Sequence, residues 1–198
     1  MMKFVLATAN KGKIREMREL LQTVGITVVS QDEVGLNLEV EETGTTFMEN
    51  AMLKAKAVCE ASGLPAIADD SGLMVDALGG EPGVYSSSYG GDALNDVQRY
   101  EHLLNKMKNM ELRAAKFVST IVCLFPDGDV LTSVGECQGE ILYAPRGTGG
   151  FGYDPVFLVD GTGKSMAELT LDEKNAVSHR GAALREFVRR LHQYLSEK

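Results

Sequence analysis

The chain has 198 residues, of which 44% are apolar and 24% are charged. This length and balance predict one globular domain, spanning residues 1–198, with a core that needs no disulfide or metal. The formal net charge of −8 argues against a general nucleic-acid binder, because neutralising a phosphate backbone takes clustered Lys and Arg. This charge does not exclude a small anionic ligand that is bound by local basic groups, backbone amides and a divalent ion.

The three cysteines, Cys59, Cys123 and Cys137, are odd in number and widely spaced. We therefore expect buried thiols rather than a disulfide framework or a metal cluster. No apolar run reaches the length of a membrane span, and the apolar start is too short for a secretory signal. These features predict a cytoplasmic protein that has neither a membrane nor a nucleic acid as its partner.

The first element is expected to be a buried strand at residues 3–8, followed by the polar loop Thr8–Lys13 and a helix. The helix would place Ile14, Met17, Leu21 and Val24 on one side. A polar, glycine-containing loop at a helix start suits anion binding, because free amides and the positive end of the dipole point outward there. It is not a P-loop, since Ile14 stands where a magnesium-binding Ser or Thr should be. The alternative is simple solvation of Lys11 and Lys13.

An acidic loop at residues 39–44 follows a second strand expected at residues 26–29. The capping-box pattern Thr46–Glu49 then predicts a helix that ends at Gly63. Only this helix separates Glu41 and Glu42 from the next strand. In a β-helix-β layout the two loops can open on one sheet edge, where carboxylates could hold a metal. Alternatively, the acids merely favour the dipole of the helix that follows them.

The next stretch, Ala66-Ile-Ala-Asp-Asp-Ser-Gly-Leu73, is an apolar run that ends in two carboxylates, a hydroxyl and a glycine. It predicts a short buried strand that opens into a polar turn, where α/β proteins usually place their chemistry. Successive strand side chains point to opposite faces, so we expect Asp69 and Asp70 to have different roles. The alternative is a turn in which Asp70 or Ser71 caps a following helix.

Residues 79–91 are rich in Gly, Ser and Tyr and predict a long ordered loop. A helix is expected at residues 95–108. Its inward residues would be Val97, Tyr100, Leu104 and Met107. Two strands, at residues 117–125 and 130–134, flank the hairpin signal Pro126-Asp-Gly-Asp129. The order of elements predicts an α/β fold with a mixed sheet.

The segment Gly147–Pro155 holds four glycines together with Phe151, Tyr153 and Asp154. Aromatic rings among glycines suggest stacking on a base, although the rings could equally anchor the loop in the core. A capping box at Thr170–Glu173 precedes a last, core-packing helix. His179 and Arg180 lie at its start, where cations oppose the dipole, so they indicate an anionic or carbonyl-bearing ligand nearby. Pairing of Arg180 with a surface Glu is the alternative.

Together, five segments resemble the inosine triphosphate pyrophosphatase family, and within it the bacterial dITP/XTP pyrophosphatases. They are Leu6–Lys13, Glu41–Ala51, Ala68–Leu73, Gly149–Pro155 and Ser178–Gly181, and they follow the family order over nearly the whole chain. Ala9 departs from the glycine that many relatives have there. The resemblance implies an elongated, two-lobed mixed α/β fold, related to that of the Maf proteins, with flanking helices, a central substrate cleft and a homodimeric assembly.

The same resemblance implies hydrolysis of deaminated purine nucleoside triphosphates to the monophosphate and pyrophosphate, with Mg²⁺. Asp70 would act as general base or metal-bound carboxylate, with Glu42 a better candidate than Glu41 for the second metal carboxylate. Substrate would be bound by Thr8, Ala9, Asn10, Lys11, Gly12, Lys13, Ser71, Phe151, Gly152, Tyr153, Asp154, Lys174, His179 and Arg180. The alternatives are a Maf-like pyrophosphatase acting on other modified nucleotides and a nucleotide-binding regulator without turnover.

Overall fold

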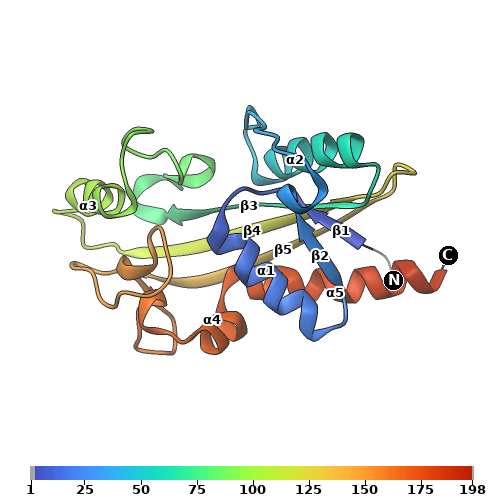
Figure 1. The fold of residues 1–198 in the computed structure, drawn as a ribbon. Helices are drawn as coiled ribbons and strands as arrows, with labels where there is room; N and C mark the ends of the chain where they lie inside the picture. Colours follow the sequence, from blue (N-terminus) through green and yellow to red (C-terminus); the bar gives the residue numbers. More distant parts are fainter. Residues whose placement is uncertain (1–2, 198) are drawn as a thin grey trace. The chain divides into compact units, whose positions relative to one another are not determined.

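The computed structural model describes residues 3–197, in which six strands form one sheet in the order β2-β1-β3-β4-β5-β6 (Figure 1). The strands are β1 (Lys3–Leu6), β2 (Thr27–Ser30), β3 (Ala66–Val75), β4 (Ala114–Leu124), β5 (Val130–Ile141) and β6 (Phe157–Val159). β1 pairs in parallel with β2 and β3, whereas β5 and β6 are antiparallel. The predicted mixed α/β sheet is therefore confirmed.

The sheet is accompanied by the helices α1 (Lys11–Thr23), α2 (Phe47–Ser62), α3 (Asp96–Lys106), α4 (Leu171–Val177) and α5 (His179–Glu197). The capping boxes predicted at Thr46 and Thr170 are both present, and each N-cap hydroxyl accepts a backbone N–H three residues on. Gly63 ends α2 with a left-handed φ of 65°, as its position predicted. Among the described residues, no helix is both long enough and apolar enough to cross a membrane.

The chain divides into two compact units, and we describe each by itself. Unit 1 comprises Met1–Asp70, Ser119–Gly135 and His179–Lys198, and unit 2 comprises Ser71–Val118 and Glu136–Ser178. The strands β3, β4 and β5 contribute residues to both units. Because the chain passes between the units several times, no single linker separates them. That residues 1–198 form one domain stays a prediction.

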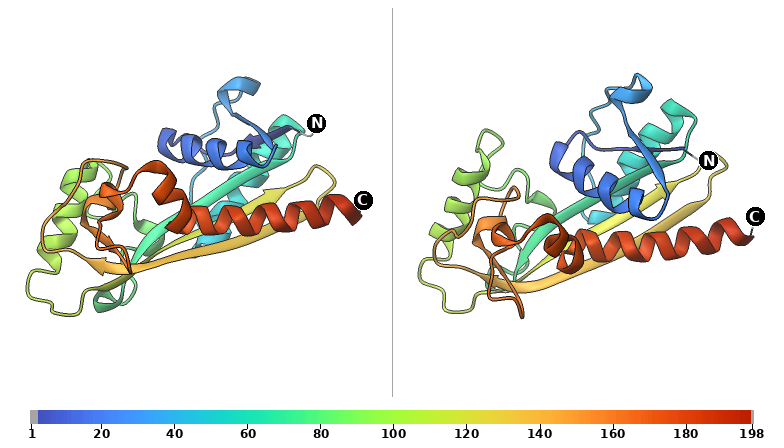
Figure 2. Two further views of the ribbon diagram at one scale, coloured as in Figure 1. Left: turned by 90° about the horizontal axis from the view of Figure 1, so that it is seen from below. Right: turned by 60° about the horizontal axis from the view of Figure 1, so that its bottom comes forward.

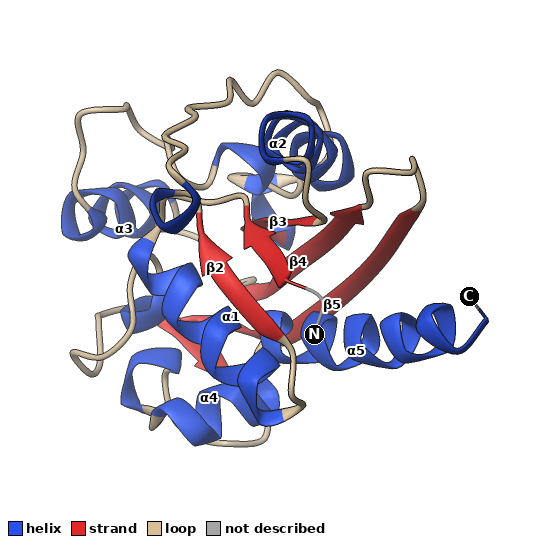
Figure 3. Cartoon of the chain, turned by 45° about the vertical axis from the view of Figure 1, so that its right-hand side comes forward, coloured by secondary structure: helices blue, strands red, loops and turns tan. Residues whose placement is uncertain are grey.

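In unit 1, α1 and α5 cover one face of the sheet and α2 covers the other (Figure 3). The first face packs Phe4, Leu6, Ile67 and Ile121 against Met17, Leu21, Leu184 and Phe187. The second face packs Val5, Ala7, Ala66, Ala68 and Val122 against Ala51, Ala55 and Val58. Strand side chains alternate between the faces, so both cores can be read along β1 and β3.

The first turn of α5 lies directly against β5 at Gly135 (Figure 2). A Cβ added to Gly135 would lie 2.2 Å from the carbonyl oxygen of His179 and 2.3 Å from the nitrogen of Ala183. In addition, the hydroxyl of Ser133 donates a hydrogen bond to the carbonyl of Ala183 at 2.8 Å. The absence of a side chain at residue 135 thus allows the start of α5, with His179 and Arg180, to pack directly on β5 in unit 1.

The inward face of α3 in unit 2 matches the prediction for Tyr100, Leu104 and Met107, which pack in the unit 2 core, but not for Val97. Val97 is 48% exposed, whereas Leu103 and Met107 are fully buried and pack in the unit 2 core. The reason is Arg99, which lies on the inward face, one turn before Leu103. Its guanidinium donates hydrogen bonds to the carbonyls of Tyr89, Gly91 and Leu94. An arginine whose donors are satisfied can occupy a buried position that a hydrophobic pattern does not predict.

Two strands end later than expected. β3 continues through Val75, so the turn predicted at residues 69–72 is wrong. β5 reaches Ile141 instead of residue 134, with alternating buried and exposed residues. Carboxylates usually end a buried strand because burying them is costly. Those of β3 do not, because lysine and arginine side chains meet them within the fold.

Candidate functional site

The start of α1 is organised by two polar side chains. Asn10 caps the helix by accepting the Lys13 N–H at 3.1 Å, and the Thr8 hydroxyl accepts the Asn10 N–H at 3.2 Å. The first turn carries Lys11 and Lys13 and has no acidic residue. Because the backbone amides and the helix dipole both favour negative charge, this turn is suited to an anion.

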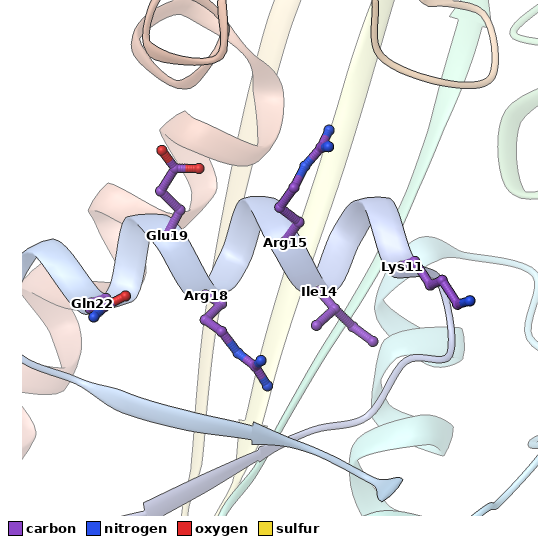
Figure 4. A pocket seen from close by; sticks show the side chains of 6 residues that line it. All are labelled: Lys11, Ile14, Arg15, Arg18, Glu19 and Gln22. Carbon is purple, nitrogen blue, oxygen red and sulfur yellow. The ribbon is translucent and has the colours of Figure 1, made fainter. Parts of the chain in front are cut away.

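Lys11 and Lys13 belong to different surroundings. Lys11 lines an open hollow of about 380 Å³ along the outer side of α1 (Figure 4). The other residues of this hollow are Ile14, Arg15, Arg18, Glu19 and Gln22, all from the same helix. Lys13 instead contacts Asp69, with its Nζ 3.0 Å from Oδ2. Of the two lysines, Lys13 is therefore the one tied to the carboxylates of β3.

Asp69 is fully buried on the face of β3 that α1 and α5 cover. Its Oδ2 meets Nζ of Lys13 at 3.0 Å and Nε of Arg180 at 3.5 Å, and the guanidinium of Arg180 is also bound by Glu16. Burial alone would raise the pKa of Asp69, but Lys13, Arg180 and Lys54 outweigh it and hold the pKa well below its usual range. Burial in turn lowers the pKa of Lys13, against the opposing effect of Asp69. Asp69 is thus a fixed anion that neutralises buried cations.

Asp70 lies on the opposite side of the strand, next to α2. Nζ of Lys54 is 3.6 Å from Oδ1 of Asp70 and 2.6 Å from Oε1 of Glu42. Burial raises the pKa of Asp70, and the nearby Glu42 adds to this, while Lys54 and Lys13 act against it. One ammonium therefore bridges two carboxylates that lie on either side of α2 in the sequence.

The donor set around Lys54 also suits a hard divalent cation. Among residues 3–197, no group of three or more His, Cys, Asp and Glu side chains could hold a metal by itself. Mg²⁺ needs no such cage, because one or two carboxylates, water and substrate phosphates complete its octahedron. Glu42 and Asp70 are two carboxylates that already share one positive group, so their oxygens fit the role. Glu41 and Glu42 are both exposed, so the contact with Lys54 is what distinguishes Glu42.

In unit 2, Phe151 lies beside a buried ion pair. Nζ of Lys174, on α4, is 2.7 Å from Oδ2 of Asp154, and both side chains are only 6% exposed. The same ammonium is 4.9 Å from the centre of the Phe151 ring, and the Phe151 N–H donates to Oδ2 of Asp154 at 3.0 Å. The ring of Phe151 is half-buried, and the segment that carries it is held by charge-assisted bonds.

Tyr153 has a different role from Phe151, although both are aromatic. Tyr153 is 4% exposed, packs in the unit 2 core and donates its hydroxyl hydrogen bond to the carbonyl of Ser86 at 2.8 Å. Tyr153 therefore anchors the loop. Of the two rings, that of Phe151 is the one available to stack on a ligand. Ser71 also lies in unit 2, half-buried on β3 directly after Asp70.

The predicted site residues fall into the two units as follows. Unit 1 holds the Thr8–Lys13 loop, Glu41, Glu42, Asp70, His179 and Arg180, and unit 2 holds Ser71, Phe151, Gly152, Tyr153, Asp154 and Lys174. Arg180 was expected beside the base, and it contacts Glu16 and Asp69. The alternative prediction, that Arg180 pairs with a Glu, is confirmed, but this partner, Glu16, is buried rather than on the surface.

Sequence reasoning missed several residues that organise these groups. Glu16 follows Lys13 by three positions, a spacing that places both on one helix face. Lys54 follows Asn50 by four positions on α2, and a hydrogen bond joins the Asn50 side chain to Asp70. Asn50 and Lys54 each precede a buried alanine, Ala51 and Ala55, and this repeat in the sequence could have indicated a polar contact at the edge of the buried face of α2. Asp96 gave no such signal, because its partner Gly152 lies far away in the sequence.

Comparison with known proteins gives a consistent result. The sequence profile of the Ham1 family matches residues 4–190. A dITP/XTP pyrophosphatase of Thermus thermophilus is 53% identical over 189 residues, which cover 94% of this chain and 90% of that protein. One from Yersinia pseudotuberculosis is 50% identical and covers 93% and 95%. The solved structure of a HAM1 protein from Coxiella burnetii, 41% identical, matches over 100% of both chains with a TM-score of 0.88.

Proposed function

This chain belongs to the Ham1 family, and from that premise we propose that it hydrolyses deaminated purine nucleoside triphosphates. The substrates would be dITP, ITP and XTP, and the products the nucleoside monophosphate and pyrophosphate, which removes these nucleotides from the pool. The observation that carries the proposal is the bridge of Lys54 between Glu42 and Asp70 in the same unit as Lys13 and the start of α1. This supplies carboxylates, a lysine and a helix N-terminus for a triphosphate.

Phosphoryl transfer depends mainly on positioning and on neutralising charge. The start of α1 would bind phosphate oxygens, because its free amides present positive charge and that turn holds no acid. Lys13, whose Nζ lies 3.0 Å from Asp69, would add a donor to the same oxygens. Glu42 and Asp70 would hold Mg²⁺, which supplies charge neutralisation at the phosphates when bound. Asp70 would orient the attacking water and accept its proton, since it is the carboxylate whose pKa is raised by burial.

Unit 2 would recognise the base. The ring of Phe151 offers a stacking surface, and base–aromatic stacking contributes about 1–3 kcal/mol in nucleic-acid complexes. Hypoxanthine and xanthine carry a 6-oxo acceptor where adenine carries an amino donor. Donors of unit 2, such as Lys174 and backbone amides, would donate to the 6-oxo oxygen and would mismatch the amino group of adenine, and such sites discriminate by roughly 10⁴-fold. Guanine shares the 6-oxo group, so its 2-amino group must be what is refused.

The proposal extends to location and assembly. All three cysteines are buried and free, as predicted, which suits the reducing cytoplasm. A homodimer follows from the resemblance, and Tyr85 and Tyr143 of unit 2, 65% and 73% exposed, are the type of residue that interfaces bury. Light scattering on the purified chain would measure its mass.

A nucleotide panel tests the proposed function directly. The purified chain is given dITP, ITP, XTP, ATP and GTP with Mg²⁺, and both the rates and the products are measured. We expect the deaminated nucleotides to exceed ATP and GTP in kcat/KM by orders of magnitude, with pyrophosphate released. Equal rates for all purine triphosphates would contradict the selectivity. Release of orthophosphate would place the enzyme in another reaction class.

A further inference from the structure

Both peptide groups that flank Phe151 are fixed by hydrogen bonds. The Phe151 N–H donates to Oδ2 of Asp154 at 3.0 Å, and the Phe151 carbonyl accepts the Asp154 N–H at 3.2 Å. The next N–H, that of Gly152, donates to Oδ2 of Asp96 at 2.7 Å. Fixing the two peptide planes on either side of one Cα fixes its φ and ψ. These bonds therefore determine the direction in which the Phe151 ring leaves the backbone.

Asp96 differs from the other partner because it lies outside the loop. Asp154 lies three residues after Phe151 and also pairs with Lys174 on α4, so its bonds hold the shape of the turn and link the turn to α4. Asp96 lies 56 residues before Gly152, at the first position of α3. Its carboxylate ties the Gly152 N–H of the peptide after Phe151 directly to α3.

The end of α3 that carries Asp96 is itself well anchored. Asn95 and Gln98 form a reciprocal capping box at the helix start. Arg99, one turn after Asp96 and only 7% exposed, donates to the carbonyls of Tyr89, Gly91 and Leu94. Because this helix end is anchored, the Asp96 carboxylate has a defined position. Its hydrogen bond to Gly152 therefore fixes the position of the Gly152 N–H.

The N–H group that Asp96 accepts belongs to a glycine with an unusual backbone conformation. Gly152 adopts φ +60°, a left-handed conformation that other residues rarely take. A carboxylate accepting a backbone N–H is about twice as strong as a neutral acceptor. Because Asp96 itself is exposed, replacing it should leave the core of unit 2 intact.

We propose that Asp96 is a positioning residue for base recognition: by holding the peptide after Phe151, it orients the ring on which the nucleobase stacks. This rests on the proposed function, in which Phe151 contacts the base. Asp96 then acts on ligands through Phe151 and touches no reacting atom. Its removal should weaken the binding of ligands that contain a base, leave pyrophosphate binding unchanged, and leave the chemical step unchanged at saturating substrate.

Three variants separate this role from a structural one. Asp96→Ala removes both the charge and the acceptor, whereas Asp96→Asn removes the charge but keeps an amide oxygen that can accept the Gly152 N–H. Both lose the same favourable charge at the α3 N-terminus, so a difference between them reports the hydrogen bond. Asp92→Ala is the matched control, since Asp92 is also exposed and lies in the loop just before α3.

The readouts are KM and kcat for dITP, and the inhibition constants of dIMP and of pyrophosphate. For Asp96→Ala we expect KM and the dIMP constant to rise about tenfold, which corresponds to ~1.4 kcal/mol, with kcat within about twofold of the wild type. For Asp96→Asn we expect a rise of about threefold or less, because a neutral acceptor remains. The pyrophosphate constant should match the wild type in every variant.

Three results would overturn the inference. Asp96→Ala could behave like Asp92→Ala, Asp96→Asn could lose as much as Asp96→Ala, or kcat could fall with KM unchanged. Each assumes that the wild type converts dITP to dIMP and pyrophosphate. Failure of that reaction in the wild type would reject the proposed function itself, so the two failures are distinguishable.

Discussion

Asp69 and Asp70 are consecutive residues of β3 whose carboxylates meet different helices. Asp69 contacts Lys13 of α1 and Arg180 of α5, and Asp70 contacts Lys54 of α2. Strand alternation places them on opposite faces, and their surroundings move the two pKa values in opposite directions, down for Asp69 and up for Asp70. One acid is therefore kept as a permanent anion, while the other is the better proton acceptor.

Asp70→Asn should lower kcat by about 10²–10⁴-fold, the range expected for loss of a general base. The fold should persist, because Lys54 keeps its 2.6 Å partner Glu42 when the charge of Asp70 is removed. Steady-state kinetics with dITP measure the first effect, and urea unfolding measures the second. Turnover close to that of the wild type would remove Asp70 from the mechanism.

Asp69→Asn should act chiefly on stability. It leaves Lys13, whose side chain is 14% exposed, without its carboxylate, although Arg180 keeps Glu16, so we expect a loss of about 3 kcal/mol in the free energy of unfolding. Because the pKa of Asp69 is lowered in the fold, its stabilisation is complete above about pH 4 and is lost as pH falls further. The difference between variant and wild type in urea should therefore be full at pH 7 and shrink below about pH 4.

The metal carboxylate can be identified by comparing Glu42→Gln with Glu41→Gln. Both residues are exposed, but Glu42 contacts Lys54, which it shares with Asp70. We expect Glu42→Gln to raise the Mg²⁺ concentration for half-maximal activity by about tenfold or more, since Mg²⁺ binds through only one or two carboxylates. Glu41→Gln should change it little, and EDTA should abolish turnover of the wild type. The reverse order would assign the ligand to Glu41.

Local patterns in the sequence predicted the secondary-structure elements better than they predicted the tertiary contacts. The caps at Thr46 and Thr170 are local hydrogen bonds between residues three apart, and both were found. The pairing of Lys13 with Asp69 joins residues far apart in the chain, and no local pattern encodes it. The turn expected at Asp69 failed for this reason, because the cost of burying a carboxylate depends on partners that only the tertiary fold supplies.

The three buried thiols should be unreactive in the native chain. Burial raises the pKa of Cys59 and Cys123, and that of Cys137 to about 11, so little reactive thiolate exists at about pH 8. Because the pKa of Cys137 is raised in the fold, its contribution to stability is complete below the ordinary thiol pKa. This contribution is lost as pH rises toward about 11. Titration with a thiol reagent at about pH 8 should detect three thiols only after unfolding in urea. Rapid labelling of the native chain would contradict the burial.

The buried pair Asp154–Lys174 should be strongly coupled, and α4 provides a matched exposed pair for comparison. Asp154→Asn, Lys174→Met and the double variant define a double-mutant cycle in urea unfolding. We expect a coupling of about 2 kcal/mol, since both side chains are 6% exposed and 2.7 Å apart. Lys164–Glu173 has a similar distance of 2.8 Å but exposures of 45% and 43%, so its coupling should stay below about 1 kcal/mol. Equal couplings would show that burial does not strengthen the interaction that holds the Phe151 segment.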